Sequence, residues 1–131
     1  MNPKDYLLQY HESFLKVRAL NAHIRKLRDE AELLRTQEGH RIALDKAAAN
    51  IVDAVDQLAA ETARMKALQR ELRRVIEMVP DAEQRALLTL IYVEGLKLST
   101  AARRMAYSYR QTKRIHKAAL DAVAEILSSP E

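Results

Sequence analysis

The feature that most constrains the fold is the near absence of glycine and proline, the residues that most often interrupt helices. The chain of 131 residues has 2 Gly and 3 Pro, and residues 4–37 and 40–79 contain neither. Both stretches are rich in Ala, Leu, Glu, Arg and Lys, which favour helix. Each stretch exceeds an ordinary globular helix in length, so the sequence predicts two long helices separated near Gly39.

An apolar repeat of seven residues runs through both stretches. Such a repeat packs helices side by side, and the short break at Gly39 predicts an antiparallel hairpin, or coiled coil. Polar Ser13 and Glu61 interrupt the pattern. The residues expected in the hairpin core or in an oligomer contact are Leu7, Phe14, Ile24, Leu27, Ile51, Leu58, Met65 and Leu72.

The outer faces of the hairpin carry opposite charges four residues apart along the sequence. The expected ion pairs are Arg25–Asp29, Lys26–Glu30 and Arg28–Glu32. On a helix such pairs each add a few tenths of a kcal/mol.

After Pro80 the signals change to those of short helices. Asp81 with Gln84 three residues later resembles a capping box, Gly95 is placed as a C-terminal cap, and Ser108 is a good N-cap. The expected helices span residues 82–94, 98–105 and 109–127. The predicted domains are a hairpin over 1–79, which mediates oligomerisation, and a three-helix module over 80–131.

The net positive charge lies in the C-terminal module. Residues 92–120 hold seven Lys or Arg residues and no acid after Glu94, whereas the whole chain has 22 basic and 18 acidic residues. Two helices joined by a tight turn form a helix-turn-helix, whose second helix enters the DNA major groove. In the last helix, apolar residues share one face and Arg110, Arg114 and Lys117 share the opposite face. The expected DNA-binding residues are Tyr109, Arg110, Gln111, Lys113, Arg114, Lys117, Arg103 and Arg104.

The stretch "IYVEGLKLSTAARRMAYSYRQTKRIHKAALDAVAEIL" resembles region 4 of bacterial sigma factors. The positions that carry the resemblance are Tyr92, Glu94, Gly95, Leu96, Ala102, Met105, Ser108, Ile115, Ala119 and Leu120. The chain as a whole, from "MNPKDYLLQY" onward, resembles small phage and prophage proteins, some of them late transcriptional regulators of the RinA/ArpU kind. Ala106 departs from the sigma pattern, because that turn position is usually Gly.

The resemblance implies promoter binding, and the predicted function is that of a sequence-specific phage transcriptional regulator of late genes. Two alternatives remain open. A small terminase subunit also pairs a helix-turn-helix with an oligomerising hairpin, although its DNA-binding part usually comes first. An adaptor could instead use the module on RNA polymerase without DNA specificity of its own.

The expected partners are double-stranded DNA and a second copy of the chain. Host RNA polymerase is a further candidate partner. The dimer prediction rests on an apolar surface at Leu7, Phe14 and Leu15, beside Ile76, which one internal seam is not expected to cover. This surface could pack on the C-terminal module or on another subunit.

Other classes of protein find little support in the sequence. The chain has no Cys, its four His residues do not have metal-ligand spacing, and no nucleophile–base pair or phosphate loop occurs. We therefore expect neither an enzyme, nor a metal site, nor a cofactor. The start of the chain lacks a signal-peptide core, and the longest apolar run, "ALLTLIYV", is too short for a membrane span. The expected location is the cytoplasm of a bacterial host.

Overall fold

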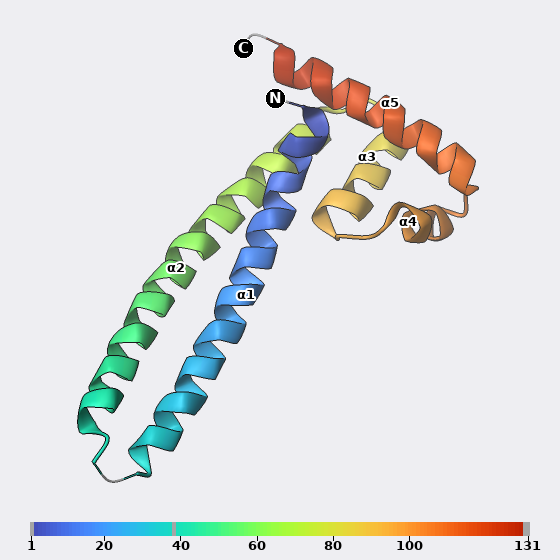
Figure 1. Cartoon of the computed structure of the whole chain (residues 1–131). Helices are drawn as coiled ribbons and strands as arrows, with labels where there is room; N and C mark the ends of the chain where they lie inside the picture. The colour runs from blue at the N-terminus through green and yellow to red at the C-terminus, as the bar shows by residue number, and fades with distance from the viewer. Residues whose placement is uncertain (1, 38, 130–131) are drawn as a thin grey trace. The chain divides into compact units, whose positions relative to one another are not determined.

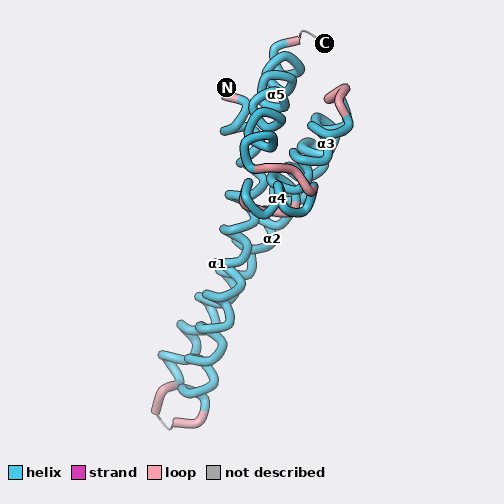
Figure 2. Tube along the Cα trace, turned by 90° about the vertical axis from the view of Figure 1, so that its right-hand side faces the viewer, coloured by secondary structure: helices cyan, strands magenta, loops and turns pink. Residues whose placement is uncertain are grey.

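The computed structural model describes residues 2–37 and 39–129, and these residues form helices, turns and no strand (Figure 2). The elements are α1 (Pro3–Arg35), α2 (Arg41–Met78), α3 (Ala82–Leu88), the π-helix η1 (Thr89–Val93), α4 (Leu98–Met105) and α5 (Tyr109–Ser128). The predicted all-helical class and the long first pair of helices are confirmed (Figure 1).

The chain divides into two compact units, one of residues 13–65 and one of residues 1–12 with 66–131. This division cuts through both long helices, whereas the sequence predicts a boundary between 79 and 80. The predicted boundary separates two domains that fold on their own, and the compact units do not test this. The boundary therefore stays a prediction.

Residues 13–65 contain the parts of α1 and α2 that flank the turn. Ile24 and Ala54 are buried here, each 4% exposed. The other predicted core positions in this unit, Phe14, Leu27, Ile51, Leu58 and Met65, are partly buried. The interrupting residues Ser13 and Glu61 meet, because the Ser13 hydroxyl donates a 2.7 Å hydrogen bond to Oε1 of Glu61. The seam of this unit is therefore a mixed one, with a polar contact among partly covered apolar residues.

The expected ion pairs on the outer face of α1 are wrong in detail. Among the described residues, Glu32 pairs with Arg35 at 2.6 Å and not with Arg28, and neither Arg25–Asp29 nor Lys26–Glu30 comes within ion-pair distance. Exposed side chains of this length gain little from any single pairing, so spacing alone does not select the partner.

Residues 1–12 and 66–131 contain the main apolar core. Leu7, Leu72, Val79, Leu88 and Tyr92 are buried together, and Ala119 and Val123 of α5 join them. Tyr10 and Tyr6 add hydrogen bonds to α2: Gln69 donates to the Tyr10 hydroxyl and the Tyr6 hydroxyl donates to Glu71, each at 3.2 Å. Burial raises the pKa of Tyr6 to about 12, with Glu71 adding to the effect. The start of α1 is thus bound into the same core as α5.

The apolar residues near the start of α1, predicted to pack on the C-terminal module or on a second copy, are covered in part within one chain. Leu7 is 0% exposed and Ile76 is 4% exposed, so both lie in the core of one chain. They are covered because the helices after Pro80 supply apolar partners, and no area is left there for a dimer. Leu15 remains 47% exposed.

Two local interactions end α2 and begin α3. The Asp81 side chain accepts the Gln84 backbone N–H at 3.0 Å, as the capping pattern predicts. Arg85 then reaches back and donates to the carbonyls of Val79, at 2.7 Å, and Pro80, at 2.9 Å. These carbonyls follow the last turn of α2 and have no helical donor. Arg85 therefore links the two helices across the break at Pro80.

The helix expected over 82–94 is α-helical only as far as Leu88. Residues Thr89–Val93 form a π-helix, and the Glu94 N–H bonds to the Thr89 carbonyl at 3.0 Å. The Thr89 hydroxyl donates to the Arg85 carbonyl at 2.9 Å, an interaction that loosens the regular helical ladder. The segment ends at Gly95, whose φ of 76° is the left-handed value predicted for this cap.

Candidate nucleic-acid interface

The N-terminus of α5 is held by the residue before it. The Ser108 hydroxyl accepts the Gln111 backbone N–H at 3.0 Å, which is the expected N-cap bond. The Thr112 hydroxyl donates to the Ser108 carbonyl at 2.8 Å. Thr112 is 0% exposed, so both bonds fix the first turn of α5 against the core. Side chains that project from this turn therefore have a defined direction.

A left-handed cap joins α4 to α5. Ala106 has a φ of 60° and is the one described non-glycine residue with positive φ. Its N–H bonds to the Arg103 carbonyl at 3.1 Å, and the Tyr107 N–H bonds to the Ala102 carbonyl at 3.0 Å. These two bonds form a Schellman motif, which usually has Gly at the position of Ala106. The turn geometry expected of the sigma pattern is thus formed with alanine in the strained position.

α5 has one buried and one exposed face. Thr112, Ala119 and Val123 are buried, each 0% exposed, while Ile115 and Ile126 are partly buried. All of the predicted contact residues of this helix are exposed: Tyr109, Arg110, Gln111, Lys113, Arg114 and Lys117. The helical period places the cations opposite the core, and the structure brings them together along one helix as the sequence predicts.

Two predicted residues on α5 also contact each other. The Lys113 ammonium lies 5.6 Å from the centroid of the Tyr109 ring, within the range of a cation–π contact. Tyr109 is 53% exposed, so its ring does not belong to the core. The contact holds both side chains over the first turn of the helix.

The two arginines of α4 lie at the end of that helix. Arg103 and Arg104 are exposed, while Ala101 and Ala102 before them are buried. The carbonyl of Arg103 takes part in the cap of the turn. The structure therefore places the α4 arginines beside the turn that leads into α5, within the same compact unit. The N-cap of α4 itself is Lys97, which makes no side-chain capping bond.

A part-buried hydrogen bond links η1 to α5. The Tyr92 hydroxyl and Nε2 of His116 lie 2.7 Å apart, and the two rings stack with centroids 5.9 Å apart. Burial raises the pKa of Tyr92 to about 12. Burial, with the nearby Lys4 ammonium, lowers the pKa of His116 below its ordinary value. His116 therefore joins α5 to η1 through Tyr92.

The turn residue Tyr107 has a polar partner on α3. Its hydroxyl donates to Oε2 of Glu83, and this hydrogen bond raises the pKa of Tyr107. Neither Glu83 nor Tyr92 carries a sequence signal of its role, because each partner lies 24 residues away along the chain.

Within residues 2–37 and 39–129, no group of three His, Cys, Asp or Glu side chains is arranged to hold a metal ion. In the same residues, no helix has the length and apolarity needed to cross a bilayer.

Comparison with known proteins identifies the family. Residues 17–123 match a family described as "Protein of unknown function (DUF1492)". The match spans most of the chain, so the chain belongs to this family. No curated protein and no solved structure is significantly similar to the chain. The family description assigns no activity, so a functional proposal depends on the geometry of α4 and α5.

Proposed function

We propose that the protein binds double-stranded DNA in a sequence-specific manner and regulates the transcription of phage late genes. The observation that carries the proposal is the exposed basic face of α5, which begins at an N-cap and lies opposite a fully buried row. α4, the Ala106 turn and α5 have the order of a helix-turn-helix, in which the second helix enters the major groove.

The residues of α5 divide by chemistry into base readers and backbone contacts. Arg110, Gln111 and Arg114 lie in the N-terminal half of the helix, which meets base edges in this class of motif. Arginine can hydrogen-bond guanine, and glutamine adenine, through two bonds each. Lys113, Lys117, Arg103 and Arg104 are suited to phosphates, which set register without reading sequence. Tyr109, held near Lys113, adds a ring beside the first turn.

The regulatory part of the proposal is supported by the resemblance of residues 91–127 to sigma region 4. A module of this kind recognises promoter DNA, and host RNA polymerase is its natural second partner. We also propose that two copies act together, because paired half-sites are usual for helix-turn-helix proteins. A ring of about eight or more copies would instead favour the terminase alternative, and a failure to bind any duplex would favour the polymerase adaptor.

The test is a binding-site selection from randomised duplexes with the full-length protein, followed by affinity measurements on the selected site. Arg110→Ala should lower affinity for the selected site by about 1–3 kcal/mol and relax the preference at one base pair. Lys113→Ala should weaken selected and random duplexes to a similar degree.

The matched control is Arg73→Ala, which removes an exposed arginine from α2 in the same compact unit. It should leave the base preference unchanged. If selection yields no preferred sequence, or if Arg110→Ala binds selected and random duplexes as the wild type does, the proposed recognition by α5 is wrong.

A further inference from the structure

A second basic segment lies outside the C-terminal module. Residues 13–28 contain Lys16, Arg18, Arg25, Lys26 and Arg28 and no acid. Acidic residues before and after this segment cancel its charge in the net charge of the chain. The segment therefore does not add to the net positive charge, which lies in residues 92–120. All of these residues belong to α1, and they lie within the compact unit of residues 13–65.

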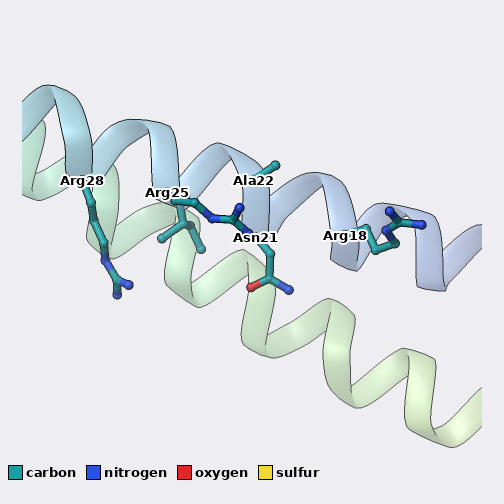
Figure 3. A pocket seen from close by; sticks show the side chains of 6 residues that line it. Arg18, Asn21, Ala22, Arg25 and Arg28 are labelled. Atoms are coloured by element: carbon teal, nitrogen blue, oxygen red, sulfur yellow. The ribbon is translucent and has the colours of Figure 1, made fainter.

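Three of these arginines surround a shallow hollow on α1. The hollow has a volume of about 540 Å³, and Arg18, Asn21, Arg25 and Arg28 line it together with Ala22 and Ile24. In Figure 3 all of the labelled side chains come from α1, and Arg25 extends along the helix toward Asn21. Ile24 is only 4% exposed, so the hollow has an apolar floor and exposed polar walls.

The guanidinium groups of this row lack acidic partners. Among the described residues, no carboxylate lies within ion-pair distance of Arg18, Arg25 or Arg28. Arg18 contacts a ring instead, with its guanidinium carbon 5.9 Å from the centroid of Phe14. That contact orients Arg18 without neutralising it. The row therefore presents three guanidinium groups, none within ion-pair distance of a described carboxylate, and the Asn21 amide on one helix.

We propose that the row of Arg18, Asn21, Arg25 and Arg28, here called the α1 arginine row, binds the phosphate backbone of duplex DNA. It is a contact independent of sequence and separate from the contact made by α5. The inference takes its ligand class from the proposed function, since it assumes that the polyanion is DNA. It goes beyond that function by assigning a DNA-binding role to the hairpin, whose predicted role is oligomerisation.

The chemistry and spacing of the row suit a phosphate strand. The planar guanidinium group presents donors whose geometry matches phosphate oxygens. It is also more weakly hydrated than an ammonium group. Arg18 and Arg28 are ten positions apart, which is about 15 Å along a helix. One DNA strand advances about 3.4 Å for each phosphate, so the row can meet phosphates spread over about four base pairs. Asparagine also donates to phosphate oxygens in such interfaces.

The first test compares the full-length wild type with Arg18→Gln/Arg25→Gln/Arg28→Gln in salt titrations on a random-sequence duplex of about three helical turns. Removing three phosphate contacts should make the slope of log K against log salt shallower by about 2.7. Arg18→Lys/Arg25→Lys/Arg28→Lys keeps the charge, so it should retain most of the slope. Circular dichroism verifies that each variant remains helical.

The matched control is Arg41→Gln/Lys46→Gln/Arg64→Gln, which removes three exposed cations from the α2 part of the same unit. It should keep a slope close to that of the wild type. An equal loss in this control would show a general charge effect and overturn the α1 arginine row. A wild-type slope in the row variant would overturn it as well.

Two further arms separate this inference from the proposed function and from another polyanion. Lys113→Ala/Lys117→Ala is titrated in parallel. If this α5 variant loses affinity for DNA and the row variant does not, α5 binds DNA and the α1 arginine row does not. The reverse result would support DNA contact by the row and overturn DNA contact by α5. If the wild type binds no duplex, both proposals fail. Poly-L-glutamate serves as the competing probe: loss of its binding in the row variant, with DNA binding kept, would assign the row to an acidic protein.

Discussion

The hydroxyl of Ser13 donates a 2.7 Å hydrogen bond to Oε1 of Glu61, joining the two polar residues that interrupt the apolar repeats of α1 and α2. Ser13 is 2% exposed and Glu61 is partly buried. Arg64 lies near the same carboxylate, with its Nε 3.9 Å from Oε1. The two interruptions therefore compensate each other, because each polar side chain is the other's hydrogen-bond partner.

The first prediction concerns this pair. Ser13→Ala should lower the free energy of unfolding by about 1–3 kcal/mol, because it leaves a partly buried carboxylate without its donor. Ser13→Ala/Glu61→Leu should be less destabilised than Ser13→Ala alone, since an apolar pair needs no donor. Urea unfolding followed by circular dichroism measures both, with Glu61→Leu completing the cycle. Additive effects of the two single changes would show that the bond contributes nothing to stability.

The second prediction concerns the turn before α5. Ala106→Gly should stabilise the protein by about 0.5–1 kcal/mol, because glycine adopts the left-handed φ of 60° without the clash that alanine suffers. Ala118→Gly is the control, because Ala118 is exposed within α5 and glycine costs about 1 kcal/mol at such a position. Thermal unfolding should move in opposite directions for the two variants. A lower midpoint for both would mean that position 106 has no strain to relieve.

The third prediction follows from the lowered pKa of His116, which faces Tyr92 and lies near Lys4. Below a pH of about 6.5 the unfolded histidine binds a proton that the folded protein still excludes, so the unfolded state binds more protons. Stability should therefore fall as pH decreases from about 7.5 through 6.5 toward the lowered folded pKa.

His116→Gln should remove this part of the pH dependence, because glutamine does not titrate. The control His23→Gln changes an exposed histidine and should keep it. Thermal midpoints across the pH range measure the difference. Parallel pH profiles for wild type and His116→Gln would contradict the role given to this side chain.

The helices could be predicted from sequence because their ends carry local signals. Asp81, Gly95 and Ser108 each act within one turn of the residue that they cap, so their effects can be read along the chain. The exposed basic face of α5 was predictable for a similar reason, because the helical period separates it from Thr112, Ala119 and Val123.

The remaining features depend on contacts between distant residues. Ser13 and Glu61 are 48 positions apart, and Tyr92 and His116 are 24 apart, so no local pattern pairs them. The π-helical turn at Thr89–Val93 also departs from a sequence that has ordinary helix periodicity. The sequence left two partners open for Leu7, the C-terminal module and a second copy, because an isolated hairpin leaves it exposed. The core around α5 covers it.

The last prediction is that the protein is a dimer that binds two half-sites. The burial of Leu7 and Ile76 removes the surface first expected for a second copy, but other apolar residues remain exposed on α2. Val52 is 59% exposed and Val55 is 38% exposed, three positions apart on one face. Covering such residues contributes about 25 cal/mol per Å² of apolar surface. Light scattering on the full-length protein should therefore report two copies.

Val52→Lys/Val55→Lys should convert the dimer to a monomer, because two like charges would have to be buried in the contact. Selected DNA sites should contain two half-sites about one helical turn apart, or a multiple of it, for the wild type. The lysine variant should select a single half-site. Ile42→Lys is the control, because Ile42 is 86% exposed at the start of α2, outside the Val52–Val55 pair. A monomeric wild type that selects single half-sites would rule out the dimer. If the lysine variant remains a dimer, the contact between the two copies does not include Val52 and Val55.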